Sequence, residues 1–563
     1  MRKVIPTLVT TSLLVFMSQF ALAGSATWNL NPASGDWNTA ANWTPAMVPN
    51  GPSDIATFGS SNLTDIFTST NTTVNSIVFP AGASAFTISP ELGTSFEIDG
   101  VGVVNDSGAT QTFVIGANFG IQLAYLYFEG AATAGNSMTT YITEATAVGS
   151  GASTFFVDTA NAGSATFLTE GGLSDNQGAS GGSVVFSGTP NGPSASAATA
   201  TFINGGGTVS KGGGGVVAFF ASATAADATI INNPGEAPMA QGGVALFDQS
   251  STADHAVITN NGSTVDGGLG GLTFFRASHA AHGTFIANSG TGGGAGGLII
   301  FLNNSFGDFA RIQLFGNGTL QLRYRDTSTL TIGSLEGDGL VSMGTGSFAI
   351  GSNNLNTEFA GTIFDSPTGG GGALIKIGRG TLSLKRASTY TGSTIIREGT
   401  LAVRNQQGSA TGTGLVSVKA GTLAGGGTLG GNVIVGTQSA GPAILSPGTN
   451  AANPQTLTIQ GSLTLEASST YSCDLKSDST QADNVVAAGV SIVGDSQISL
   501  ADSGTASLPP GTSFTIIRNT AATPISGTFS NLPDGEPITV GSNTFQANYE
   551  GGDGNDLTLT VVP

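Results

Sequence analysis

Three titratable residues, Asp227, His255 and His282, each lie eight residues after a phenylalanine. If those phenylalanines mark one structural register, the three side chains stack in a column, Asp227 over His255 over His282. Imidazole nitrogens are common ligands of transition metals, so the column is a candidate metal site. His279 and His282 have neither the spacing nor the Glu of a zinc-protease helix. Because the column offers no further ligand, we interpret it as a polar outer face and assign no metal ligand.

A second motif with coordinating groups lies near the C-terminus. Residues 551–556 are Gly-Gly-Asp-Gly-Asn-Asp, which matches the start of a calcium-binding nonapeptide repeat. In that repeat, carboxylates and carbonyls from successive turns share each ion. A single copy has no neighbour to complete the ligand sphere. We therefore interpret the motif as a plain turn, and calcium binding stays open.

Residues suited to acid–base catalysis are sparse. Polysaccharide lyases and hydrolases need clustered carboxylates, or a base beside a carboxylate, along one groove. From residue 24 to residue 310 the only basic residues are Lys211 and Arg276. The acids of this range are scattered, for example at Asp158, Asp175, Asp227, Asp248 and Asp266. We predict no catalytic or cofactor-binding residue and no enzyme; the alternative is a carbohydrate-active enzyme.

The elements that hold these groups follow a repeat. Phenylalanines recur after Gly-Gly pairs at nearly constant spacing, namely at Phe186, Phe219, Phe247, Phe274 and Phe301. A small residue lies nine residues after most members of this series or after Phe156 upstream: Ala165, Ala228, Ala256, Gly283 and Ala310. Two markers in one register indicate a supersecondary unit stacked on copies of itself.

Each unit contains two short apolar runs separated by small residues and a glycine-rich return. Asn232 and Asn260 begin Asn-Asn pairs that lie one repeat apart. Asn suits repeated corners because it tolerates left-handed backbone geometry, and we expect its side chains to bond from coil to coil. The pattern predicts an all-β fold, a parallel β-helix whose coils rise by about 4.8 Å. The mature chain would form a rod on the order of 100 Å long.

From about residue 321 the period shortens. Gly-Thr-Leu recurs at closer intervals there, beginning at Gly380, Gly399 and Gly421. The stretch Leu374 to Val403 holds an apolar-Lys-x-Gly-x-Gly-Thr-Leu strand, a Tyr-Thr-Gly turn and a closing Gly-Thr-Leu strand. It resembles the autotransporter-associated β-strand repeat of passenger regions in bacterial surface proteins. The resemblance implies a right-handed parallel β-helix that is exported and then displayed or released.

The two ends of the chain bear on its location. Residues 1–23 predict an export signal, with Arg2 and Lys3 as its positive region and Ala21-Leu22-Ala23 as its cleavage site. No later segment is long and apolar enough to span a bilayer. The C-terminal part lacks the long alternating strands of an outer-membrane barrel, so we expect no self-translocation. We predict a secreted or cell-surface protein whose mode of attachment, if any, stays open.

All three tryptophans lie in the first mature segment, at Trp28, Trp37 and Trp43. A stacked rod has an open end, and large side chains can close its apolar core. We favour this capping role; the alternative is a platform for stacking sugars, as in a glycan-binding module. The only cysteine, Cys473, cannot form an intramolecular disulfide, and we expect it to be a buried small hydrophobe beside Tyr471.

Charge excludes one class of partner. The net charge is −19 at pH 7, and loss of Arg2 and Lys3 with the leader makes it −21. This balance opposes nucleic-acid binding. Ten basic residues fall between positions 311 and 419 against six acidic ones. We interpret this segment as a solvated face of the rod; the alternative is a strip that binds polyanions.

These observations divide the chain into five segments. The first two are an export signal (1–23) and an N-terminal Trp-containing β or cap segment (24–140). A β-helix with long repeats (141–320) follows, then the autotransporter-associated repeat region (321–435) and a C-terminal β region (436–563). We predict a structural or adhesion-type protein that contacts an unknown surface, glycan or protein ligand.

Overall fold

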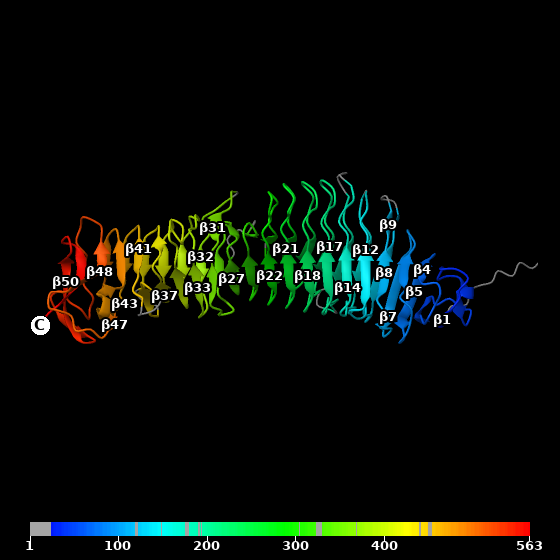
Figure 1. Cartoon of the computed structure of the whole chain (residues 1–563), viewed down its shortest axis with the longest axis horizontal. Coiled ribbons are helices and arrows are strands. Elements are labelled where there is room, and N and C mark those ends of the chain that lie inside the picture. The colour runs from blue at the N-terminus through cyan, green and yellow to red at the C-terminus, as the bar shows by residue number, and fades with distance from the viewer. Residues whose placement is uncertain are drawn as a thin grey trace, which may run out of the picture.

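The computed structural model describes residues 24–118, 122–147, 149–174, 179–189, 192, 194–302, 304–322, 329–367, 369–437, 441–448 and 453–563. In this part of the chain the structure is almost entirely β, and the helical elements are two 3₁₀ turns, η1 (Ala40–Asn42) and η2 (Ser477–Ser479). The strands wind into one elongated rod (Figure 1). The predicted export signal, Asp175, Arg323 and Arg325 lie outside the described residues.

Sheet one runs along the N-terminal part of the rod and has 15 strands, parallel apart from the terminal pair β1 and β2. In spatial order the strands are β2 (Trp43–Thr44), β1 (Ala26–Trp28), β3 (Gly51–Thr57), β5 (Thr72–Phe79), β7 (Ser95–Asn105), β11 (Tyr125–Glu129), β13 (Ser153–Phe156), β15 (Ser183–Ser187), β17 (Val216–Phe220), β19 (Val244–Asp248), β21 (Leu272–Arg276), β23 (Leu298–Phe301), β25 (Thr319–Leu322), β28 (Leu340–Met343) and β31 (Thr362–Asp365).

Sheet two follows nearly the whole rod. Its parallel strands are β4 (Asp65–Thr68), β6 (Thr87–Pro90), β8 (Gln111–Ile115), β12 (Thr139–Thr143), β14 (Thr166–Thr169), β16 (Thr201–Asn204), β18 (Thr229–Asn232), β20 (Val257–Asn260), β22 (Thr284–Ala287), β24 (Arg311–Leu314), β27 (Ser334–Gly337), β30 (Thr357–Phe359), β33 (Thr381–Leu384), β35 (Thr400–Val403), β37 (Gly421–Ala424), β40 (Ala443–Ser446), β43 (Ser469–Lys476) and β47 (Gln497–Asp502). The short strand β44 (Gln481–Ala482) pairs antiparallel with β43.

Two further sheets complete the C-terminal part. Sheet three is parallel and contains β26 (Leu330–Ile332), β29 (Phe348–Ile350), β32 (Leu374–Lys376), β34 (Thr394–Ile396), β36 (Val416–Val418), β39 (Val433–Val435), β42 (Leu463–Leu465) and β46 (Val490–Ile492). Sheet four contains β38 (Thr428–Leu429), β41 (Thr456–Ile459), β45 (Asn484–Ala487), β48 (Ser513–Asn519), β51 (Asp556–Val561), β50 (Asn543–Gly551) and β49 (Pro537–Val540). A small pair, β9 (Ala117–Asn118) and β10 (Gln122–Leu123), stands apart.

One coil consists of a sheet-one strand, a corner, a sheet-two strand and a return loop. Val216 of β17 pairs with Val244 of β19, and Thr229 of β18 pairs with Val257 of β20, all in parallel. Each coil therefore lies directly on the previous one, which confirms the parallel β-helix. The right hand of the winding stays a prediction.

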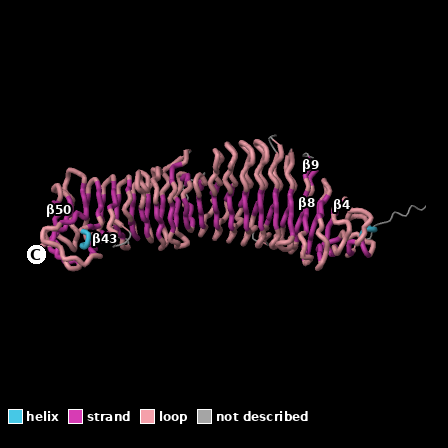
Figure 2. The backbone as a smooth tube through the Cα atoms, viewed as in Figure 1, coloured by secondary structure: helices cyan, strands magenta, loops and turns pink. Residues whose placement is uncertain are grey.

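The return loops stack into a projecting wall, which we call the arm, visible as a row of loops in Figure 2. Its backbone bonds run from loop to loop, as from the Gly235 amide to the Leu269 carbonyl at 2.9 Å. A Cβ on Gly214 would lie only 2.0 Å from the carbonyl oxygen of Gly242 in the next coil. The Gly-Gly pairs of the repeat are therefore required by close backbone contact where the arm returns to sheet one.

A column of stacked phenylalanine rings forms the centre of the core. The predicted column is confirmed at every position except Phe274. The prediction that Phe274 faces the core is wrong, because Phe247 pairs with Phe275 and Phe274 points outward. Successive ring centroids lie 4.5–5.0 Å apart. The error arose because side chains alternate between faces along a strand, so only one residue of the Phe274-Phe275 pair can face the core. The fully buried members are Phe156, Phe186, Phe219, Phe247, Phe275 and Phe301.

The small-residue marker also faces inward, as predicted. Ala165, Ala228, Ala256 and Ala310 have no exposed surface, and Gly283 is buried at the equivalent place. These residues lie at the corner just before the sheet-two strand, where the chain turns toward the core. A small side chain is needed there because the corner packs closely on the core.

A second column is polar. Asn204, Asn232 and Asn260 are fully buried at the ends of sheet-two strands. Asn204 Nδ2 donates to Asn232 Oδ1 at 2.7 Å, and Asn232 Nδ2 donates to Asn260 Oδ1 at 2.7 Å. The amides also donate to backbone carbonyls where the arm meets sheet one, as from Asn232 to Leu272 at 3.0 Å. The predicted coil-to-coil bonding of Asn232 and Asn260 is confirmed.

Replacing Asn232 with alanine is expected to destabilise the coils around β18 by about 1–3 kcal/mol, because buried partners on three coils lose a hydrogen bond. The matched control is Asn233→Ala, since Asn233 lies in a half-buried outer ladder with Asn261. Amide hydrogen exchange of β16 to β21 measures the effect locally, as suits a repeat protein. If the amides of these strands are equally protected from exchange in the two variants, the buried ladder of Asn204, Asn232 and Asn260 has no structural role.

The N-terminal end of the core is packed with aromatic rings. Trp28, Trp37 and Trp43 are 2%, 0% and 2% exposed. Trp43 lies with its ring centroid 5.0 Å from each of the other two, and all three contact Phe58. The Trp37 indole donates to the Pro49 carbonyl at 2.8 Å. No tryptophan exposes a flat face, so the alternative of a sugar-stacking platform at these residues is wrong.

The coil changes size near residue 330. Sheet three begins there with β26. This strand lies between a sheet-one strand and a sheet-two strand, where earlier coils have only a corner turn. Beyond it, Thr381 pairs with Thr400 and Thr400 with Thr422, which confirms the predicted shorter period. At the C-terminal end, β48, β51, β50 and β49 pair antiparallel. The rod thus has a wide N-terminal section with an arm and a narrower C-terminal section.

Candidate functional site

The outer face of sheet one carries a flat apolar surface that we call the apolar strip. Four consecutive strands, β17, β19, β21 and β23, each contribute two outward side chains in register. Inward core residues such as Val217 and Phe219 alternate with them. The strip consists of Val216, Ala218, Val244, Leu246, Leu272, Phe274, Leu298 and Ile300.

The strip continues toward the N-terminus through aromatic residues. Ala218 follows Val185, Phe155 and Tyr127 in the same outward column. The rings of Tyr127 and Phe155 stack with centroids 4.9 Å apart. Six of the eight strip side chains are half-buried, whereas Ala218 and Ile300 are 4% exposed.

An apolar outer face is unusual on a sheet whose inner face already packs on the core. Parallel sheets normally have both faces covered, and contiguous exposed apolar patches mark interaction sites in soluble proteins. On the outer face of sheet two, the column of Thr201 and Thr229 is polar, beside a single apolar column that includes Ile203 and Ile231. Sequence reasoning missed the strip. The signal was present, because sheet-one runs such as Val-Val-Ala-Phe-Phe are apolar at the outward positions as well as at the core positions.

The predicted histidine column exists. Its residues lie at the corner between sheets one and two, and their side chains are exposed. His255 Nδ1 lies 4.0 Å from an Asp227 oxygen and 3.1 Å from an Asp254 oxygen. The rings of His255 and His282 stack with centroids 5.2 Å apart. Among the described residues no group of three or more His, Cys, Asp or Glu side chains has a geometry that could hold a metal ion.

Carboxylates from three consecutive coils gather on the outer face near Glu129. Burial raises the pKa of Glu129, and repulsion from Glu97, Asp99 and Asp158 raises it further. A hydrolase can take both its acid and its base from carboxylates in one groove, so clustered acids are what the enzyme alternative requires. Lys211 lies in the arm and Arg276 forms an ion pair with Asp248. The group therefore has charge of one sign and is the observation that favours the enzyme alternative.

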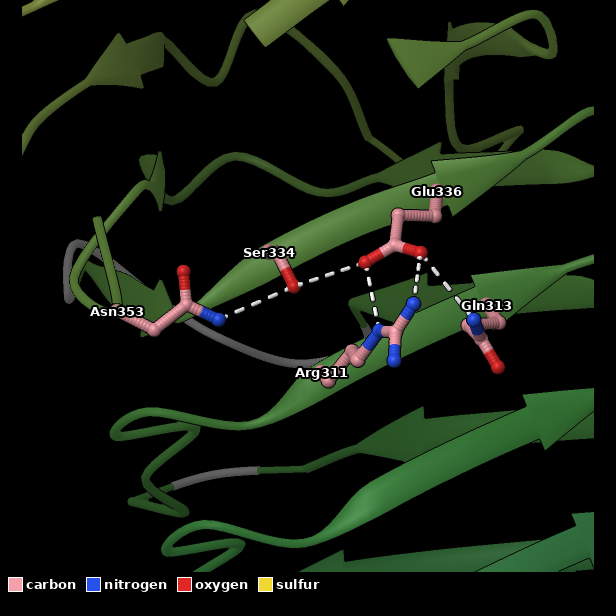
Figure 3. Close-up of polar contacts among 5 residues, drawn as sticks. All are labelled: Arg311, Gln313, Ser334, Glu336 and Asn353. Carbon is pink, nitrogen blue, oxygen red and sulfur yellow. Dashed lines mark hydrogen bonds and ion pairs between the residues drawn. The ribbon is translucent and has the colours of Figure 1, made fainter. Parts of the chain in front are cut away.

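Several basic residues of the segment 311–419 are already paired. Arg311 donates from Nε and Nη2 to the two oxygens of Glu336, at 2.7 and 2.6 Å, and Gln313 also donates to Glu336 (Figure 3). Burial raises the pKa of Glu336, but the hydrogen bonds from Arg311 and Gln313 outweigh it and leave the pKa lowered. Lys385 pairs with Glu358 at 2.8 Å. These pairs favour a solvated face over a polyanion-binding strip.

Lys376, in the resembling repeat, is buried rather than available to a partner. It is 2% exposed, and its ammonium donates to the carbonyls of Ile377 and Gly378 at 2.6 and 2.7 Å. It also donates to the Glu398 carbonyl of the next coil at 3.3 Å. Burial lowers the pKa of Lys376 to about 8, an effect that the Glu398 charge partly opposes. The lysine of the repeat thus joins a turn to the following coil.

Two further sequence candidates have structural explanations. The 551–556 motif is the turn of the hairpin between β50 and β51, and Asp556 Oδ1 accepts from the Asn519 amide at 2.9 Å. Cys473 is fully buried near Tyr471, as expected, and burial raises the pKa of its thiol. In the described part of the chain, no helix is long and apolar enough to cross a bilayer.

Residues 374–403 match the family described as Passenger-associated-transport-repeat. These are the bounds of the stretch that resembles the autotransporter-associated repeat, so that recognition is confirmed. In the structure this stretch forms β32, β33, β34 and β35, which pair in parallel within sheets two and three. The segment is therefore a passenger-type repeat built into the narrower section of the rod.

Two longer proteins are similar to this chain over part of their length. A curated protein named Adhesin BmaC autotransporter, from Brucella suis biovar 1 (strain 1330), is 36% identical over 104 residues. The match covers 18% of this chain and 3% of that protein. The crystal structure of the Haemophilus influenzae Hap adhesin aligns with 92% of this chain and 65% of that chain, at 11% identity and a TM-score of 0.30. The strand pairing itself establishes the parallel β-helix.

Proposed function

We propose that this chain is a secreted or surface-displayed β-helical rod with an adhesion-type role, and that the apolar strip is its contact surface. The observation that carries the proposal is the pair of adjacent outward apolar columns on β17 to β23. Contiguous apolar patches on an outer face mark interaction surfaces. The passenger-type repeat at 374–403 and the adhesin name of one partial relative agree with display outside the cell.

A binding role also fits the chemistry of the described residues. The carboxylates near Glu129 give a face of one charge sign, and the described residues include no group of three or more His, Cys, Asp or Glu side chains that could hold a metal ion. The strip and the acidic face around Glu129 suit a partner that is apolar and uncharged or basic at its contact surface. Nucleic acid remains an unsuitable partner because the net charge is strongly negative.

The test replaces one column of the strip. A variant with Val216→Thr, Val244→Thr, Leu272→Thr and Leu298→Thr keeps good strand formers at all four positions but removes the apolar surface. We expect its binding to epithelial cells, matrix-coated surfaces and hydrophobic beads to fall by about tenfold or more, because exposed apolar contact area drives association.

The matched control changes the other sheet. Ile203→Thr, Ile231→Thr and Ile286→Thr remove apolar side chains from the outer face of sheet two. This variant should bind as the unchanged protein does. If both variants lose binding equally, or neither does, the strip is not the contact surface. Cleavage of a polysaccharide by the purified chain would overturn the non-enzymatic proposal.

A further inference from the structure

The histidine column does not end at His282. The ring of Phe309 stacks on His282 with centroids 4.9 Å apart and planes inclined by 12°. A parallel stack beside it places Phe306 on His279, with centroids 4.6 Å apart and planes inclined by 10°. Each phenylalanine ring is parallel to a ring one coil earlier, so both rings lie across the rod axis. Their free faces point toward the next coil.

The next coil does not continue either stack. Sheet three begins there with β26, whose inward residues Leu330 and Ile332 are fully buried. Its neighbouring outward positions hold Thr329 and Thr331, which are too small to cover two aromatic rings. The change of coil size therefore exposes the last rings: Phe306 is 51% exposed and Phe309 is 47% exposed.

A hollow of about 310 Å³ lies at this step, and we call it the ring notch. Its lining combines the two phenylalanines with a carboxylate and three hydroxyl groups, from Phe306, Gly307, Asp308, Phe309, Thr329, Thr331 and Ser352. The volume is sufficient for one sugar ring and its substituents. Apolar faces with a few converging polar groups are typical of small-ligand sites.

The polar groups of the ring notch are held in place. Asp308 Oδ2 lies 3.2 Å from His279 Nδ1 and accepts from the Ala281 amide at 3.1 Å. Among the described residues, Asp308 Oδ1 accepts no hydrogen bond. Ser352 donates to the Asp308 carbonyl at 2.6 Å, which fixes the backbone between the two rings.

The three coils that line the ring notch are also joined beside it. Arg311, two residues after Phe309, forms its paired hydrogen bonds with Glu336 on the next coil (Figure 3). Asn353 Nδ2 donates to Ser334 Oγ at 3.1 Å in the same network. These contacts hold the step at a fixed distance, so the notch is formed before a ligand arrives.

We propose that the ring notch binds one sugar residue of a glycan. The apolar C–H face of a pyranose ring would lie on Phe306 and Phe309, while Asp308 Oδ1 accepts a hydrogen bond from a sugar hydroxyl. The proposal specifies a ligand class for the adhesion-type role and rests on that proposed function. Each ring is the last member of its own stack and leaves one face uncovered, so the two together form an open platform. A platform suits a flat sugar ring better than a rounded organic cation, which aromatic cages enclose.

The experiment measures binding of methyl glycosides to the purified chain by saturation-transfer NMR. The probes are the methyl glycosides of glucose, galactose, mannose and N-acetylglucosamine, each at about 10 mM, a concentration that detects millimolar dissociation constants. We expect at least one glycoside to bind, with saturation concentrated on the C–H protons of one ring face. Choline chloride serves as the cation probe.

Variants locate the site. Phe306→Ala and Phe309→Ala are each expected to weaken glycoside binding by about tenfold or more, since truncation of a ring that a ligand contacts is costly. Phe309→Trp should retain binding because it keeps an aromatic face. The matched control is Phe315→Ala, because Phe315 is also exposed, at 40%, but does not line the notch.

Each outcome decides the proposal. Failure of every glycoside to bind, binding of choline alone, or binding that survives both alanine variants would overturn it. The threonine variant of the apolar strip should keep glycoside binding, and the notch variants should keep binding to hydrophobic beads. Failure of the ring notch is therefore distinguishable from failure of the proposed adhesion-type function.

Discussion

Replacing Phe275 with alanine is expected to destabilise the coils around β21 by about 3–5 kcal/mol, the range for a large aromatic side chain removed from a packed core. Phe275 is fully buried between Phe247 and Phe301, with ring centroids 5.0 and 4.7 Å away. Its loss removes two stacked contacts and leaves a cavity in the middle of a continuous column. Neighbouring coils cannot close this cavity because backbone pairing fixes their spacing.

Phe274→Ala is the control, and the sequence provides it at the adjacent position. Phe274 points outward in the apolar strip beside Leu246 and Ile300, so its truncation is expected to cost about 1 kcal/mol or less. Hydrogen exchange of β19 to β23, together with thermal unfolding, compares the two variants. A larger effect from Phe274→Ala than from Phe275→Ala would mean that the register of β21 is one residue off.

The sequence-derived register shows what repetition does and does not reveal. Markers that stack, such as Ala228 with Ala256 and Asn232 with Asn260, follow from the period alone because each coil lies on the last. The period does not say which of two adjacent phenylalanines faces inward. That choice depends on strand alternation and on pairing with Phe247, and a one-residue slip reverses the face of every side chain.

The sequence pattern could not reveal the apolar strip or the ring notch, for physical reasons. The apolar strip consists of residues such as Val244 and Leu246 that look like core residues, because outward and inward positions of sheet one are equally apolar. The ring notch arises where two coil sizes meet, so Phe306 and Thr331 come together through a change of fold rather than through a motif. The histidine column beside the notch was predictable from the repeat, whereas the point at which the stack of rings stops was not.

We expect Asp483 to make the C-terminal section more stable in mild acid than at neutral pH. Its side chain has no exposed surface, and its oxygens accept from the amides of Gln455 at 2.8 Å and Asp474 at 3.2 Å. Burial raises the pKa of Asp483 to about 7, although these amide bonds oppose the shift. The folded chain therefore keeps the proton up to about pH 7, while the unfolded chain releases it near pH 4. Between these values the folded state binds more protons, so the free energy of unfolding falls as pH rises.

We expect β41, β43 and β45 to lose on the order of 2–4 kcal/mol of stability between pH 5 and pH 8, because one pKa unit corresponds to about 1.4 kcal/mol. Hydrogen exchange of these strands, corrected for the intrinsic effect of pH, measures the change. Asp483→Asn cannot ionise and should remove most of the pH dependence, whereas Asp495→Asn, at an exposed position, should leave it intact. If the Asp483→Asn variant keeps the full pH dependence of stability, the effect belongs to other carboxylates, because this variant has no carboxyl group at position 483.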